Sequence, residues 1–429
     1  MNRPARRAAL AAADPSPIRW AQSGLMALTG PAGGPPRLLS VDPLAAVDAL
    51  IGEVEAGATR MGRPMVVDPR LLTERAALAG LTRQGRRSCG GGARLVEARD
   101  GWLAVNLPRN SDRLSVPAWL GSGLDEDPWI AVTRGVRGRF LDDLVADGRR
   151  LDLAVAAVGG GGKAREPVKL RRMAAGSSGR RLGAAPLVID LSALWAGPLC
   201  GQLLAAAGAR VIKVESLGRP DPVRQAAPDF FDRLHVGKAS VALDFREAGD
   251  LNRLRALLHR ADVVITGARP RAFAQLGLEP ETFFAGNPGL VWVAITGHGW
   301  TGEAGNLVGF GDDAAAGAGL VAFDGAERPL FAGDALADPL TGLVAAGGAL
   351  RALGQGGGYL VDASLSGAAG FAASFTPTAE PGLVFGGSDG WQTACDGRVM
   401  PVAAPRARPW RGAAASFGAD TDQVLERLR

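Results

Sequence analysis

The segment Pro186–Ser216 constrains the fold of this chain most, because it reads as a strand, a tight turn, a helix and a second strand. Leu187–Ile189 is a short apolar run typical of a buried strand. We expect Gly197-Pro198 to break the chain before an Ala-rich helix over Leu199–Ala207, and a second strand over Val211–Val214. Such a unit normally opens a nucleotide-binding α/β domain, yet here it begins near the middle of 429 residues.

The same alternation continues after this unit. Four further strands are predicted, over Ser240–Asp244, Ala261–Ile265, Leu290–Thr296 and Tyr359–Leu365, with a helix over Gly249–Arg260. Strands that alternate with helices favour a parallel sheet covered on both faces. We therefore predict an α/β fold with a doubly wound parallel sheet over residues 186–375.

Composition excludes several classes of protein. The net charge is +5, but aromatic residues are only 6%, which does not favour a nucleic-acid partner. A modest positive charge suits an anionic, phosphate-bearing ligand. Cys89, Cys200 and Cys395 lie far apart, which favours a reducing cytoplasm and argues against structural zinc. No apolar run approaches the ~20 residues of a membrane-spanning helix, so no membrane partner is expected.

A short pattern occurs twice along the chain and indicates an internal duplication. In each copy a glycine is followed by an Asp-Pro-Leu segment and then by a second aspartate. The glycine-to-aspartate gaps are 18 and 19 residues, and the aspartate-to-aspartate gaps are 26 and 24. The corresponding positions are Gly24, Asp42 and Asp68 in the first copy and Gly319, Asp338 and Asp362 in the second.

The duplication predicts a domain plan. Residues 1–14 are an N-terminal extension, 15–158 a partial first copy forming an α+β region, and 159–185 a Gly-rich basic linker without apolar periodicity. Residues 186–375 form the sheet domain, and 376–429 a C-terminal segment that returns to it. Within the first copy, Arg94–Arg109 predicts a β-hairpin that turns at Asp100-Gly101.

Several segments resemble the class III CoA-transferases, the group of formyl-CoA transferase, carnitine CoA-transferase and the bile-acid-inducible enzymes. They are VIDLSALWAGPLCGQLLAAAGARVIKVES, GKASVALDF, ADVVITGARPRAFAQLGL, NPGLVWVAITGHG and ADPLTG, in this order from residue 188 to 342. The resemblance implies a Rossmann-like domain that binds acyl-CoA near a subunit interface, within interlocked dimers. It implies that this chain is a fused, trimmed pair, a pseudo-dimer in one chain that can pair again as a homodimer or hetero-subunit.

By resemblance, ADPLTG holds the catalytic aspartate, Asp338, whose carboxylate attacks the donor thioester to form a mixed anhydride. The alternative from the residues alone is that Asp338 only caps the following helix, since Asp is a favoured N-cap. The duplicated Asp42 is expected to be a relic that caps a helix. Gly90, Gly91 and Gly92 resemble the family's glycine-rich loop near the active site; the alternative is a plain turn before a strand.

The resemblance also implies a CoA site and no tightly bound cofactor, with the CoA thioester and a carboxylic acid as substrates. The expected CoA-binding residues are Ala193, Leu194, Trp195, Ala196, Arg219, Lys238, Arg269 and Arg271. The family's basic residue in the QLGL-type segment is Gln275 here. This departure puts the adenine site in doubt.

Four other functions compete with CoA transfer. A dinucleotide-dependent dehydrogenase is disfavoured, because the first turn is SALWAGPLCG and lacks the G-x-G-x-x-G fingerprint. Racemases of the same family use a His–Asp pair, but Phe310 stands at or beside the histidine position and His298 lies upstream. Asp312 and Asp313 are expected to be turn or cap residues. A CoA-dependent isomerase or acyl-CoA processing enzyme of the same fold, and a non-catalytic acyl-CoA-binding homologue, stay as alternatives.

Overall fold

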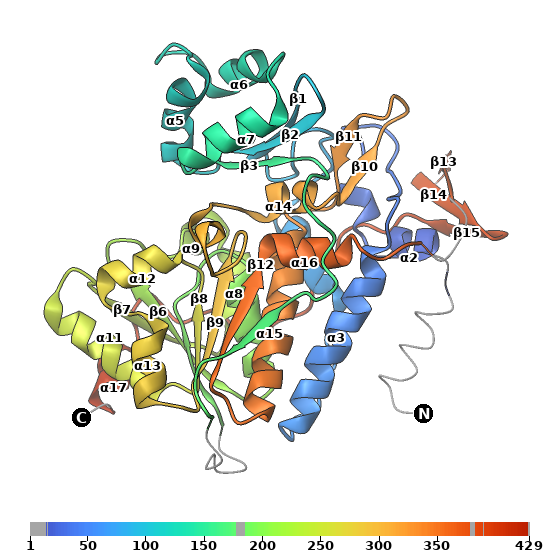
Figure 1. Cartoon of the computed structure of the whole chain (residues 1–429). Helices are drawn as coiled ribbons and strands as arrows, with labels where there is room; N and C mark the ends of the chain where they lie inside the picture. Colours follow the sequence, from blue (N-terminus) through green and yellow to red (C-terminus); the bar gives the residue numbers. More distant parts are fainter. Residues whose placement is uncertain (1–13, 15, 177–184, 378–381, 389, 428–429) are drawn as a thin grey trace.

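The computed structural model describes residues 14, 16–176, 185–377, 382–388 and 390–427 (Figure 1). Its largest sheet has the order β4-β12-β9-β8-β5-β6-β7. These strands are β4 (Lys169–Arg172), β5 (Leu187–Asp190), β6 (Arg210–Ser216), β7 (Ala239–Leu243), β8 (Val263–Thr266), β9 (Val291–Thr296) and β12 (Tyr359–Ser364). All except β4 run parallel, which confirms the predicted parallel sheet. The strand order reverses between β5 and β8, where open α/β sheets leave a crevice at the carboxyl ends.

The seventh strand, β4, lies in the segment predicted to be a linker, so that prediction is wrong for Lys169–Arg172. This strand pairs antiparallel with β12, from Tyr359↔Arg172 to Asp362↔Lys169. Three of its four residues are exposed. A solvent-facing edge strand needs no apolar alternation, which is why the sequence carried no strand signal there. Part of the same predicted linker, residues 177–184, lies outside the described residues.

Helices cover both faces of the sheet. Neighbouring strand residues alternate between two cores, with Val188 in one and Ile189 in the other. The first core holds α8 (Ala196–Ala206), α9 (Val223–Ala226), α10 (Pro228–His235), α15 (Ala337–Gly354) and α16 (Leu365–Ala372); the second holds α11 (Ala248–Arg260), α12 (Pro270–Leu276) and α13 (Pro280–Gly286). The predicted break at Gly197-Pro198 is wrong, because both residues lie in the first turn of α8. Proline is tolerated there, since its missing N–H has no helical partner.

Residues from the first half of the chain share the first core. They form α2 (Ser16–Gln22), η1 (Met26–Leu28), α3 (Pro43–Arg60), η2 (Pro69–Leu72) and α4 (Glu74–Ala79). Figure 1 shows α3 beside α15, and both helices have 18 residues. Gly347 lies against Glu53 and Gly57 against Leu350, so the two helices run in the same direction. Segments 16–80 and 186–375 therefore share the first core.

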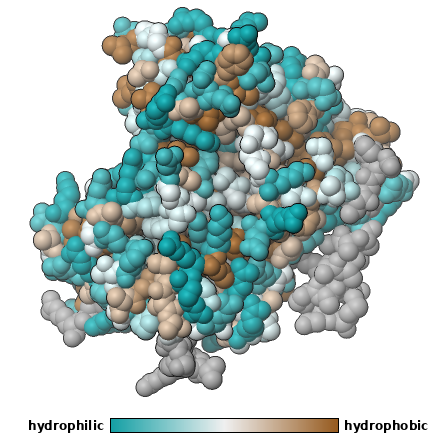
Figure 2. Space-filling view, viewed as in Figure 1, coloured by the Kyte–Doolittle hydropathy of each residue, from teal (hydrophilic) through white to brown (hydrophobic). Residues whose placement is uncertain are grey.

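The upper lobe in Figure 1 has a core of its own. It consists of β1 (Ala93–Glu97), β2 (Trp102–Asn106), α5 (Asn110–Leu120), α6 (Pro128–Val136), α7 (Leu141–Arg150) and β3 (Ala154–Ala157). The predicted hairpin is confirmed, with β1 and β2 paired from Ala93↔Asn106 to Glu97↔Trp102. The other face of this sheet packs on α14 (Gly311–Gly317), β10 (Val321–Phe323) and β11 (Pro329–Phe331). Figure 2 shows the surface hollowed between this lobe and the lobe of α11–α13.

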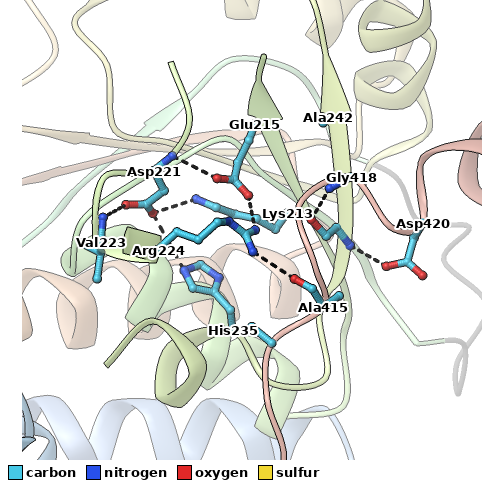
Figure 3. Close-up of polar contacts among 12 residues, drawn as sticks. Lys213, Glu215, Asp221, Val223, Arg224, His235, Ala242, Ala415, Gly418 and Asp420 are labelled. Atoms are coloured by element: carbon cyan, nitrogen blue, oxygen red, sulfur yellow. Dashed lines mark hydrogen bonds and ion pairs between the residues drawn. The ribbon is translucent and has the colours of Figure 1, made fainter. Parts of the chain in front are cut away.

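A short 3-10 helix, η3 (Glu303–Asn306), follows β9. The C-terminal segment forms β13 (Leu383–Gly387), β14 (Gly390–Cys395), β15 (Arg398–Pro401) and α17 (Thr421–Glu426). It then passes over the edge of β7, where the backbone N–H of Ser240 donates to the Asp420 carboxylate at 2.8 Å. Arg224 also donates to the carbonyl of Ala415 at 3.0 Å (Figure 3). Among the described residues, no helix combines the length and apolarity needed to cross a membrane.

Candidate active site

Asp338 lies in the first turn of α15, next to the amino end of α14. Leu336 is the N-cap of α15 and no side chain caps the helix, so the alternative that Asp338 caps it is wrong. A Cβ atom placed on Gly311 would lie 2.1 Å from Oδ2 of Asp338. Glycine at position 311 therefore lets the carboxylate lie directly against the backbone. The duplicated Asp42 does cap its helix, since it accepts hydrogen bonds from the N–H groups of Leu44 and Ala45, as predicted.

Three further aspartates and one arginine surround Asp338. Asp334 is fully buried and accepts from Nε of Arg75 at 2.7 Å. Asp312 accepts from the N–H of Ala335 at 3.0 Å. These contacts join α4 of the first half of the chain to the segment just before α15, and that segment to α14. The single guanidinium of Arg75 faces several carboxylates, and they raise its pKa although burial opposes the shift.

The environment favours the protonated form of three of these acids. Burial raises the pKa of Asp338 to about 7, with Arg75 opposing the shift and the neighbouring aspartates adding to it. Burial also raises the pKa of Asp312 to about 6 and that of Asp313 to about 7. Carboxylates crowded in a poorly solvated place cannot all ionise at neutral pH. Asp338 thus titrates near neutrality, which is typical of functional sites.

The structure brings the glycine loop to this cluster. A Cβ on Gly90 would lie 3.4 Å from the Arg75 guanidinium, and one on Gly92 would lie 3.4 Å from Oδ1 of Asn106. Asn106 in turn donates to Asp313 at 3.0 Å. Gly91 has a φ of +78°, a backbone conformation that favours glycine. The loop therefore lies between residues that touch the carboxylates.

The turn expected to bind CoA follows β5 at the carboxyl edge of the sheet. Leu194 has a φ of +72° and is 40% exposed, whereas Trp195 is buried. Arg75 lies over the Trp195 ring, 5.3 Å from its centroid. The turn and the carboxylate cluster are thus neighbours. Ser192, just before the turn, donates from its backbone N–H to Asp190 at 3.1 Å.

The four basic residues expected at CoA have different surroundings. Lys238 is 4% exposed, and its ammonium binds Asp190 and the Pro198 carbonyl, both at 2.9 Å. It is held inside the domain and supports the turn through Asp190, the last residue of β5. Arg269 and Arg271 each form a 2.6 Å ion pair with Asp152 of the upper lobe. Arg219 is exposed in the loop after β6.

A buried polar network joins β6 to the loop and helices that follow it (Figure 3). Lys213 lies 3.2 Å from Asp221, and Arg224 lies 2.6 Å from Glu215. The His235 ring is buried nearby, and burial among these cations holds its pKa well below its usual value. This network fixes the loop between β6 and α10 beside the turn after β5, because Lys213 also donates to the Ser192 carbonyl.

Sequence reasoning missed Arg75, Asn106 and Asp334, and it gave Asp312 and Asp313 only turn or cap roles. Asp313 does accept from the Phe310 N–H at 3.0 Å, but it also belongs to the cluster. Arg75 and Asn106 lie more than 200 positions from the aspartates they bind. No motif around them marks a site, so only the fold reveals them.

The comparison with protein families decides the assignment. The family model described as CoA-transferase family III matches residues 186–406, which include the turn after β5 and Asp338. This chain belongs to CoA-transferase family III. The first half of this chain, which lies outside the matched residues, contributes Arg75 and the glycine loop to the site.

Curated relatives carry related activities in their names. The chain is 36% identical over 188 residues to succinyl-CoA–D-citramalate CoA-transferase of Chloroflexus aurantiacus, covering 41% of this chain and 47% of the relative. It is 31% identical to succinate–glutarate CoA-transferase of Agrobacterium fabrum, covering 42% and 49%. It is 36% identical to mouse alpha-methylacyl-CoA racemase, covering 27% and 28%. The chain thus spans about half the length, or less, of these relatives.

Proposed function

We propose that this protein is an enzyme that transfers CoA from an acyl-CoA thioester to a carboxylic acid, with Asp338 as the nucleophile. The observation that carries the proposal is the Asp338 carboxylate itself. It caps no helix, accepts no hydrogen bond from the described residues, and interacts electrostatically with Arg75, whose guanidinium covers the Trp195 ring in the turn after β5. A pKa of about 7 supplies an ionised fraction at neutral pH while keeping the carboxylate basic enough to attack a thioester.

The proposed steps conserve atoms and charge. The Asp338 carboxylate attacks the thioester carbonyl, the C–S bond breaks, and a mixed anhydride forms with release of the CoA thiolate. The thiolate attacks the aspartyl carbonyl of this anhydride, which releases the donor acid as its carboxylate and leaves a thioester between Asp338 and CoA. The acceptor carboxylate attacks that thioester, which forms a second anhydride and releases the thiolate. The thiolate then attacks the acceptor acyl carbon, which gives the new acyl-CoA and frees the Asp338 carboxylate. An anhydride keeps the acyl group activated, so no external energy source is needed. The backbone N–H groups of the loop at Gly90–Gly92 are proposed to stabilise the oxyanion of each attack.

CoA is proposed to bind in the crevice at the carboxyl ends of the strands, along Ala193–Ala196. This turn adjoins both the sheet edge and Arg75, which supports the placement. Arg269 and Arg271 would supply cations for the phosphates, and Arg219 would do so from the loop after β6. Lys238 is instead proposed to position the turn through Asp190, because its ammonium is buried and already bound.

One observation favours a CoA-dependent isomerase as a second candidate. The sequence placed no histidine in register near Phe310, but folding brings His298 and Asp313 to the same glycine, Gly309. A Cβ on Gly309 would lie 3.2 Å from Nε2 of His298 and 3.6 Å from Oδ2 of Asp313. Such a pair could move a proton at the carbon beside the thioester. Incubation of acyl-CoA with the protein in D₂O separates the two, since only an isomerase incorporates deuterium at that carbon.

The test of CoA transfer is an exchange assay. Succinyl-CoA is incubated with a panel of carboxylic acids, and new acyl-CoA species are measured by chromatography. Asp338→Asn should abolish exchange because the amide cannot form the anhydride, whereas Asp42→Asn should leave exchange unchanged. Retained turnover in Asp338→Asn would show that another group is the nucleophile. Binding of CoA without any exchange would favour a non-catalytic homologue.

A further inference from the structure

Three buried polar atoms belong to side chains that interact electrostatically, and two of these atoms lie near Gly309. Nε of Arg149, Nε2 of His298 and Oδ2 of Asp313 are buried and form no hydrogen bond within the described part of the chain. Arg149 lies in the last turn of α7, His298 follows β9, and Asp313 belongs to α14. A buried polar group left without a hydrogen bond destabilises the folded state. Three such groups from three elements point to an occupant that satisfies them.

Gly309 leaves room beside two of these atoms, Nε2 of His298 and Oδ2 of Asp313. The position of its absent Cβ lies 3.2 Å from Nε2 of His298 and 3.6 Å from Oδ2 of Asp313, so the two atoms are within 6.8 Å of each other. Any side chain at residue 309 would enter this space. Two residues further along, Gly311 lies against the carboxylate of Asp338. The unpaired atoms are therefore a short distance from the proposed nucleophile.

The charge of this place suits one carboxylate. The Arg149 guanidinium forms no ion pair with a described residue, and its electrostatic neighbours are Asp313 and His298. Burial raises the pKa of Asp313 to about 7, so a protonated Oδ2 can donate a hydrogen bond. Burial and Arg149 lower the pKa of His298 to about 4, so its ring is neutral. The sum is one positive charge with a neutral donor beside it.

We propose that Arg149, Asp313 and His298 form a subsite for the second, non-reacting carboxylate of a dicarboxylic acid whose first carboxylate reacts at Asp338. This inference rests on the proposed CoA transfer and names its substrate class. The guanidinium group of Arg149 donates to the carboxylate oxygens, and Asp313 donates a further hydrogen bond. His298 lies beside them as a neutral polar side chain. No bond is made or broken at the subsite. Its role is to hold the acid in register with Asp338.

The test compares two acceptors of equal chain length. With succinyl-CoA as donor, kcat/KM is measured for glutarate and for pentanoate, which lacks the second carboxylate. We expect glutarate to be preferred, and Arg149→Gln to lower the glutarate-to-pentanoate ratio at least tenfold. Any effect of the variant on the donor cancels in this ratio. Arg150→Gln is the matched control, because Arg150 is the next residue, is 73% exposed and pairs only with Asp147 among the described residues.

The possible outcomes are distinct. No preference for glutarate, or a ratio unchanged in Arg149→Gln, overturns the subsite while CoA transfer stands. If Arg149→Gln does not fold, Arg149→Lys and His298→Gln are judged by the same ratio. If the wild type transfers CoA to neither acid, calorimetric binding of glutarate decides. Binding that Arg149→Gln abolishes supports the subsite although neither acid is an acceptor, and no binding overturns the subsite.

Discussion

The carboxyl group of Asp338 should destabilise the folded protein at alkaline pH. Its pKa rises from an ordinary value of 3.8 to about 7 on folding. Between these two values the unfolded state binds fewer protons than the folded state, so stability falls as pH rises. Three pKa units correspond to about 4 kcal/mol. Because Asp338 is partly exposed and its pKa also depends on the charges of Asp312 and Asp313, about half of this, ~2 kcal/mol, is expected.

Asp338→Asn removes this penalty with almost no change of shape. We expect the variant to be about 2 kcal/mol more stable than the wild type at pH 8. At pH 4 both side chains are neutral and the two proteins should match. Urea unfolding followed by circular dichroism at pH 4, 6 and 8 measures the difference. A difference that does not grow with pH, or a variant that is less stable at pH 8, would refute the assignment of a raised pKa to this carboxyl group.

Three more predictions concern the same site. Acylation of Asp338 by acyl-CoA in single turnover should speed up as pH rises through about 7, because only the carboxylate attacks; a rate that falls over this range would contradict it. Gly311→Ala should abolish transfer and lower the melting temperature, since the new Cβ would lie 2.1 Å from Asp338 and 2.5 Å from the Ala335 carbonyl; unchanged turnover would count against the geometry. Asp42→Ala should cost about 1 kcal/mol through loss of the α3 cap and leave kcat unchanged, as shown by urea unfolding and exchange assays.

The parallel sheet could be predicted from the sequence because its strands are buried on both faces. The central strands β8 (Val263–Thr266) and β9 (Val291–Thr296) read as apolar runs that end at a threonine. The exposed edge strand β4 has no such run and was read as a linker. The break expected at Gly197-Pro198 is absent because a helix tolerates proline in its first turn, where both residues lie. The residue pair alone does not tell a break from a helix start.

The candidate site was only partly predictable. Asp338 lies in the motif ADPLTG, and the glycine loop is marked by its three consecutive glycines, so both could be proposed from the sequence. No motif or unusual composition surrounds Arg75 and Asn106, and their roles arise from contacts between the two halves of the chain. The buried state of Lys238 was also invisible, because its partner Asp190 lies 48 residues away. Long-range pairing of charges is set by packing, which local patterns do not encode.

The most direct test of the account is to trap the acylated enzyme. The protein is mixed with succinyl-CoA, quenched with hydroxylamine or borohydride, digested and mapped by mass spectrometry. We expect one modified residue, Asp338, and no modification in Asp338→Asn. A modification at Asp312, Asp313 or Asp42 in the wild type, or CoA exchange without any trapped adduct, would contradict the claim that Asp338 is the nucleophile.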